Sequence, residues 1–87
     1  MNQSLIFNDG TVFENSHAME MGSGLYVYFG GASMLDVLQI LSDREKTSRI
    51  QYNFNSVELV FEGYTKPKLI NDEGTAITGL LAKEGAE

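Results

Sequence analysis

Alternation of apolar and polar positions dominates the chain and predicts mainly β-strands. The clearest run is 25–29, where Leu25, Val27 and Phe29 share one face and Tyr26 and Tyr28 share the other. Further strand-like runs cover 4–7, 11–13, 48–54, 57–63 and 75–83, and the ambiguous stretch 15–21 suits a half-buried strand. Turn sequences separate the runs, and the Asp-Gly pair at 9–10 predicts a hairpin over 4–14 because it tolerates positive φ.

One segment has helical rather than strand periodicity, and it predicts a helix over 34–42. Its apolar stripe is spaced i, i+3, i+4 and i+7 and consists of Met34, Val37, Leu38 and Leu41. Ser33 precedes the stripe as an N-cap, and Asp36 stands three residues later, as in a capping box. Because the stripe needs a surface to cover, we expect the helix to pack on the strands.

These elements predict an α+β fold: an antiparallel sheet of five to six strands with one short α-helix on one face, in the order β-β-(β)-α-β-β-β. Pro67 cannot donate to a strand ladder, so the strand at 57–63 is predicted to end there or to lie at an edge. With 87 residues and no linker, the chain is predicted to be one domain, 1–87. The predicted inward residues are Leu5, Phe7, Leu25, Val27, Phe29, Val37, Leu38, Leu41, Ile50, Tyr52, Phe54, Val57, Leu59 and Phe61.

Composition excludes several classes of protein. The chain has no Cys and one His, which excludes a disulfide framework, a thiolate metal site and a multi-His site. No apolar run approaches the roughly 20 residues that span a membrane, and no basic segment precedes an apolar stretch. We therefore expect no membrane partner and no secretion by a signal peptide. The net charge of −6 argues against direct binding to nucleic acid.

Charge is distributed unevenly along the chain. Residues 1–43 hold no Lys or Arg, whereas 44–87 hold all the bases and are near neutral. A solvated face without a partner explains such a pattern, and an acidic surface that meets a basic partner is the alternative. The acids of that alternative surface are Asp9, Glu14, Glu20, Asp36 and Asp43.

The sequence offers little support for catalysis or ligand binding. His17 is the only imidazole and has no G-x-S-x-G motif to accompany it, which is typical of a surface residue. The loop 30–33 precedes a helix but lacks a Walker lysine, so it is typical of a plain turn rather than an anion site. Turn acids such as Asp72 and Glu73 need no Ca²⁺ to explain them. We predict a non-enzymatic protein with no catalytic, metal or cofactor residue and no identified small-molecule ligand.

Tyrosines opposite the predicted core indicate a protein-binding surface. One helix covers only one face of a sheet, so the face with Tyr26 and Tyr28 is either solvated or covered by a partner. Tyr is enriched in interface cores, and it also suits an exposed strand. Val60 falls out of the core register and would widen the patch. The predicted protein-binding residues are Tyr26, Tyr28, Val60 and Tyr64, and the partner is another protein or a second copy of the chain.

Three segments carry a resemblance to a known group of proteins. They are 5–11 (LIFNDGT), 41–50 (LSDREKTSRI) and 61–66 (FEGYTK). Together, in this order, they resemble small uncharacterised proteins encoded in phages and prophages of Gram-positive gut bacteria, although the Lys66-Pro67-Lys68 sequence departs from that pattern. The resemblance implies a phage origin, with a location in the bacterial host cytoplasm or the virion, and it implies no catalytic residue.

A phage origin leaves two non-enzymatic classes of function. The first is a small virion- or tail-associated or assembly protein that acts through repeated contacts. The second is an acidic inhibitor of a host defence enzyme, similar to an anti-CRISPR protein. A small hydrolase is disfavoured because the sequence shows no catalytic constellation. The aromatic sheet face and the low density of acids favour the first class.

Overall fold

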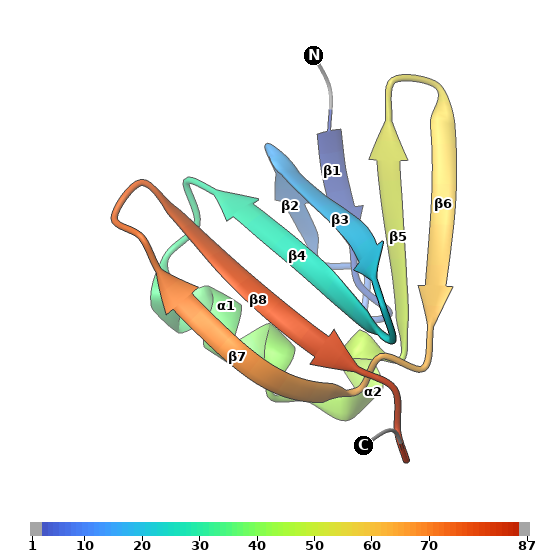
Figure 1. Ribbon diagram of the computed structural model, residues 1–87. Coiled ribbons are helices and arrows are strands. Elements are labelled where there is room, and N and C mark those ends of the chain that lie inside the picture. The colour runs from blue at the N-terminus through green and yellow to red at the C-terminus, as the bar shows by residue number, and fades with distance from the viewer. Residues whose placement is uncertain (1–2, 86–87) are drawn as a thin grey trace.

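The computed structural model describes residues 3–85, which form eight strands and two helices (Figure 1). The strands are β1 (Gln3–Ile6), β2 (Val12–Glu14), β3 (Ser16–Met21), β4 (Gly24–Gly30), β5 (Arg49–Phe54), β6 (Val57–Glu62), β7 (Lys66–Asp72) and β8 (Ala76–Ala82). The helices are α1 (Met34–Leu41) and α2 (Arg44–Thr47). The strands build two four-stranded antiparallel sheets: sheet A in the order β2-β1-β5-β6, and sheet B in the order β3-β4-β8-β7.

The predicted fold class, a sheet of five to six strands with one helix, is wrong. The described chain is mostly β, and its strands divide between two sheets because the backbone turns sharply where a single continued sheet was expected. At Asn15, with φ of 55°, the chain leaves β2 and enters β3 in the other sheet. The Gly30 N–H donates to the Asn15 carbonyl at 3.1 Å, and a Cβ at Gly30 would lie 2.6 Å from that oxygen. This corner therefore requires glycine at position 30.

Strand β7 is absent from the predicted order because Pro67 interrupts its pattern. β7 is an edge strand of sheet B, and an edge is where a missing N–H is tolerated. A register irregularity between Pro67 and Leu69 accommodates the proline. The predicted strand at 57–63 corresponds to β6, which ends at Glu62, before Pro67, and lies at an edge of sheet A.

Local signals at turns and caps are confirmed. In the β1–β2 hairpin, the Phe7 N–H donates to the Thr11 carbonyl at 2.9 Å, and Gly10 has a φ of 89°. At the start of α1, the Ser33 hydroxyl accepts the Asp36 N–H at 3.2 Å, which satisfies one of the donors left free in the first helical turn. Neither helix within residues 3–85 has the length and apolar character needed to span a membrane.

The core lies between the two sheets and α1, which covers one face of sheet B (Figure 1). Phe7 and Phe13 from the first hairpin pack on Phe29 of β4, with ring centroids 6.1 and 4.9 Å away. On the helix side, a Cβ at Gly79 would lie 3.1 Å from Leu41 Cδ1. Gly79 therefore lets α1 lie close against β8.

Several predicted inward residues are not buried. Leu38 is 43% exposed because α1 turns Ile40, rather than Leu38, toward the core beside Val37 and Leu41. Val57 and Leu59 are 54% and 47% exposed because they belong to β6, at the edge of sheet A. The aromatic residues Tyr52, Phe54 and Phe61 are only partly buried. The core also contains residues missing from the predicted set: Ala18, Ile40, Tyr64, Ile77 and Leu81.

Candidate protein-binding surface

The alternation in β4 determines where its two tyrosines lie. Leu25, Val27 and Phe29 are fully buried on the face of sheet B that α1 covers, so Tyr26 and Tyr28 point to the opposite face, where both are half-buried. Within residues 3–85, Figure 1 shows no helix or strand lying across this second face. The outer face of sheet B, which carries the two tyrosines, is therefore open in the structure.

Neighbouring strands extend this face with further large side chains. His17 of β3 stands opposite Tyr28, and the two rings stack with centroids 4.8 Å apart and planes 10° apart. Met19 is exposed opposite Tyr26, and Leu80 of β8 flanks Tyr26 on its other side. The outer face of sheet B therefore presents apolar and aromatic groups across three adjacent strands.

Sheet A contributes two more rings to the same surface. The Tyr52 ring of β5 lies 6.4 Å from His17 between centroids, and the Phe54 ring lies 6.3 Å from Tyr52. Both residues are half-buried. We refer to His17, Tyr26, Tyr28, Tyr52 and Phe54 as the aromatic surface.

This surface carries no formal charge at neutral pH. Burial against the surrounding rings lowers the pKa of His17, which favours the neutral imidazole. Burial also raises the pKa of the Tyr52 phenol, which keeps it protonated. An uncharged aromatic surface loses little solvation free energy when a partner covers it.

A pocket of about 260 Å³ opens on the outer face of sheet B beside Tyr26. Its apolar lining comes from Met21, Leu69 and Leu80, and Asn71, Thr78 and the carboxylate of Glu73 supply polar groups. Apolar pockets that admit a partner side chain are typical positions of interface hot spots.

Among residues 3–85, the contacts of His17 bear on whether it could take part in acid–base chemistry. None of the hydrogen bonds within residues 3–85 joins its ring to a serine or a carboxylate. The adjacent Ser16 is fully buried, and its hydroxyl donates to the Glu14 carbonyl at 2.9 Å. The contacts of the imidazole are with aromatic rings, which suits packing rather than proton transfer.

The structure separates Tyr64 and Val60 from the other two predicted binding residues. Tyr64 is only 4% exposed, and its hydroxyl donates to Glu20 Oε2 at 2.8 Å. Burial, together with that carboxylate, raises the pKa of the Tyr64 phenol. Val60 is exposed, but its position in β6 puts it on the opposite face of sheet A from Tyr52. Neither residue belongs to the aromatic surface.

The acids proposed as an alternative surface come together only in part. Asp9 and Asp43 lie on either side of Lys46, each with a carboxylate oxygen 3.9 Å from Nζ. Hydrogen bonds donated by Thr11 hold the pKa of Asp9 below its ordinary value. Glu20 is engaged by Tyr64 instead. The acidic side chains around Asp9 therefore surround the positively charged Lys46, and Glu20 lies outside this cluster.

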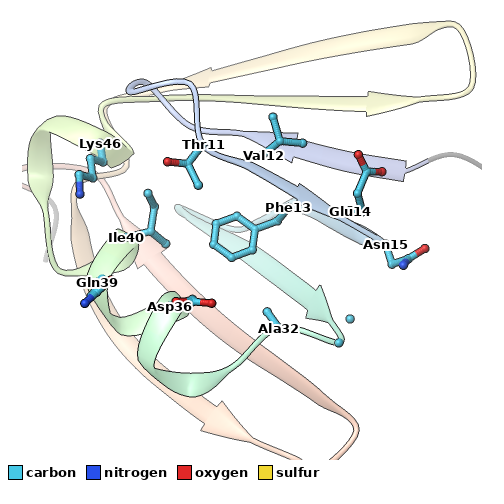
Figure 2. Close-up of a pocket in the computed structure, with 12 residues that line it drawn as sticks. Thr11, Val12, Phe13, Glu14, Asn15, Ala32, Asp36, Gln39, Ile40 and Lys46 are labelled. Carbon is cyan, nitrogen blue, oxygen red and sulfur yellow. The ribbon is translucent and has the colours of Figure 1, made fainter.

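Glu14 and Asp36 line a pocket of about 480 Å³ between β2, the loop 30–33 and α1 (Figure 2). Phe13 and Ile40 give this pocket an apolar side, and Lys46 stands at one end of it. Within the described chain, no group of three or more His, Asp or Glu side chains is arranged to hold a metal ion. The pocket thus has mixed character, with both signs of charge.

Part of the aromatic surface was missing from the sequence prediction. His17 and Met19 alternate with the buried Ser16 and Ala18, so the period-two pattern of 16–21 is the signal that places them with Tyr28 and Tyr26. Tyr52 and Phe54 were assigned to the core, since alternation shows that they share a face with Ile50 but not how far the other sheet covers that face.

No family model matches this chain, and no curated protein or solved structure is significantly similar to it.

Proposed function

We propose that this protein is a phage- or prophage-encoded, non-enzymatic interaction module: a small virion-associated or assembly protein that binds another virion protein through the aromatic surface. The observation that carries the proposal is the uncharged row of rings that continues from the outer face of sheet B, which no described element covers, onto sheet A. Aromatic residues dominate the energetics of protein interfaces. The proposed origin, and a location in the host cytoplasm or the virion, rest on the sequence resemblance.

The size of the surface constrains how the partner binds. A stable interface buries about 800 Å² on each partner. The outer face of sheet B is four strands wide, with the strands about 4.8 Å apart. The proposed partner therefore inserts an apolar side chain into the pocket beside Tyr26 and extends across Tyr52 and Phe54 of sheet A.

A second candidate function is inhibition of a host defence enzyme through acidic side chains. The observation in its favour is that Glu14 and Asp36 share one pocket. Lys46 lies in the same region and is ion-paired with Asp9 and Asp43, which reduces the negative potential there. The aromatic surface is therefore the preferred site.

A capture experiment with matched variants tests the proposal. Tagged wild-type protein, incubated with disrupted virions and with lysate of infected host cells, is expected to retain a virion protein. Tyr28→Ala is expected to lose it, because truncating an interface hot spot costs about 2 kcal/mol or more. Leu35→Ala removes an apolar group that is 66% exposed on α1 and is expected to retain the partner.

Two results would count against the aromatic surface. One is a partner that survives Tyr28→Ala but is lost from a Glu14→Gln, Asp36→Asn double variant, which would support the inhibitor function. The other is the absence of any specifically retained protein from both sources.

A further inference from the structure

The four sheet edges formed by residues 3–85 differ in how they are protected against pairing with another chain. β2 is only three residues long, and β3 packs against β1 of the other sheet. β7 carries Pro67 between two lysines, and a register irregularity follows it. Short strands, Pro, bulges and charged side chains, especially Lys, are the usual devices that block edge pairing. β6 has six residues with no proline, no lysine and no register irregularity, and its only charges are those of Glu58 and Glu62.

The free backbone groups of β6 can be assigned from its pairing with β5. The Gly63 N–H donates to the Ser48 carbonyl at 3.0 Å, which extends the β5–β6 register by one hydrogen-bonded pair. Antiparallel ladders alternate such pairs with non-hydrogen-bonded ones. The N–H and C=O groups of Val57, Leu59 and Phe61 therefore point toward β5, and those of Glu58, Val60 and Glu62 point toward the open edge.

Four of the six side chains of β6 are apolar. Val57, Leu59 and Val60 are all exposed. Glu62 is already paired with Arg49 at 3.9 Å, so Glu58 is the acid on this strand without such a pairing in the described chain. A long, exposed and apolar edge strand is a template for addition of another strand.

We propose that β6 pairs antiparallel with β6 of a second copy of this chain, about a two-fold axis at Leu59. In that register Leu59 faces Leu59 of the second copy, and Val57 faces Phe61 of the second copy. Glu58 and Val60 then exchange main-chain hydrogen bonds across the axis. The strand is thus complementary to itself in both its side chains and its free backbone groups, which is what a two-fold interface requires.

Neighbouring registers are less favourable. A shift that centres the pair on Val60 sets Glu58 directly opposite Glu62 of the second copy, and like charges in facing positions destabilise a strand pair. A slip by one residue would set Leu59 against a residue on the other face of the sheet. The register centred on Leu59 avoids both conflicts.

The pairing joins the two copies of sheet A into one continuous sheet. Because the axis is perpendicular to that sheet, Tyr52 and Phe54 of both copies lie on the same side of it. The dimer thus presents two aromatic surfaces together, which raises binding to a repeated partner through avidity. The pairing does not depend on the proposed function, since Val60 and the axis of β6 lie outside the aromatic surface.

Main-chain pairing is tested with a proline at the open edge. Sedimentation equilibrium of the wild-type protein at micromolar concentrations is expected to show a monomer–dimer equilibrium. Val60→Pro removes an N–H that faces the second copy while sparing the ladder with β5, and it is expected to weaken dimerisation about tenfold or more. Val60→Thr keeps the N–H and is expected to dimerise like the wild type. Tyr28→Ala is also expected to leave the dimer intact, which separates this test from that of the proposed function.

The register is tested with single cysteines, since the chain has none of its own. Facing residues in a non-hydrogen-bonded pair have Cα atoms about 4.5 Å apart, within the range of a disulfide. Leu59→Cys is therefore expected to form a disulfide-linked dimer on mild oxidation, whereas Val57→Cys is expected to stay unlinked. A wild-type protein that remains monomeric at all concentrations, or equal cross-linking of the two variants, would overturn the proposal.

Discussion

Tyr64 is almost fully buried in the core. It follows Gly63, where φ of 88° turns the chain away from sheet A, and this turn directs the ring into the core. Its hydroxyl donates a hydrogen bond to Glu20, which is 44 residues away in the sequence. A contact between residues so far apart in sequence leaves no local pattern, so nothing near Tyr64 in the sequence argued against its prediction as a protein-binding residue.

Removing that hydroxyl is expected to destabilise the protein. Tyr64→Phe deletes a hydrogen bond to a carboxylate at a nearly fully buried residue, and we expect the free energy of unfolding to fall by about 1–2 kcal/mol. Urea denaturation measures the change. Tyr26→Phe is the control, since Tyr26 is half-buried, and it is expected to be nearly neutral. Equal stability of Tyr64→Phe and the wild type would show that the bond contributes nothing.

His17 is expected to make stability sensitive to mild acid. Burial lowers its pKa in the folded protein, so below the ordinary value of about 6.5 the unfolded chain binds the proton more readily. The free energy of unfolding should therefore be at its full value above about pH 6.5 and decrease as the pH falls toward the lowered folded-state pKa. In His17→Gln this part of the decrease should disappear. Urea denaturation at a series of pH values below about 6.5 compares the wild type with His17→Gln. Parallel curves would contradict the prediction.

At the scale of elements, the rotation of α1 shows what a helical pattern leaves undecided. Apolar residues occupy most of its positions, including Leu35 and Leu38 on the side that the structure exposes. Two apolar stripes with helical spacing can be drawn through Val37: one includes Leu38 and the other includes Ile40. The choice depends on where Phe13 and β8 lie around the helix, and that is information from the tertiary fold.

Alanine variants of two leucines test the observed rotation. Leu41 is fully buried against Gly79, so Leu41→Ala is expected to cost about 2–5 kcal/mol of unfolding free energy. Leu38→Ala, at a residue 43% exposed, is expected to cost less than about 1 kcal/mol. Both values come from chemical denaturation under the same conditions. A reversed order would mean that α1 packs on its other side.

The strands were easier to predict than the sheets that contain them. Alternation and turn residues located the β1–β2 and β5–β6 hairpins, whose partners are adjacent in sequence. The pairings of β4 with β8 and of β1 with β5 join distant segments, and no local pattern specifies them. The two-sheet arrangement depends on these distant pairings, which explains why the strands were largely found and the fold class was wrong.

The same limit applies to the candidate site. Alternation in β4 was sufficient to predict that Tyr26 and Tyr28 share a face away from Leu25 and its neighbours. It was insufficient for Tyr52 and Phe54, because their exposure depends on where β3 crosses sheet A. Periodicity thus identifies which residues lie together, and only the tertiary fold decides which faces remain open.

At the scale of the whole molecule, folding reduces the charge asymmetry of the sequence. Lys46, from the second half of the chain, lies between Asp9 and Asp43 of the first half. Arg44 pairs with Glu84 at 3.1 Å, within the second half. The acids of residues 1–43 therefore form a weaker field than their sequence distribution indicates, which bears on how a partner is attracted.

Salt dependence distinguishes the two candidate modes of partner binding. Raising the salt concentration shortens the screening length from about 10 Å at 0.1 M to about 3 Å at 1 M, which weakens attraction between exposed charges but not apolar burial. Because the aromatic surface is uncharged, the affinity for the captured partner should hold or rise with salt, and Tyr28→Ala should weaken it by about 2 kcal/mol or more. Calorimetric titration at both salt concentrations measures these changes. The opposite result would be a tenfold or greater loss of affinity in high salt together with an unchanged affinity of Tyr28→Ala. Because salt screens only the contribution of charged groups, that result would assign binding to the acids around Glu14 and Asp36.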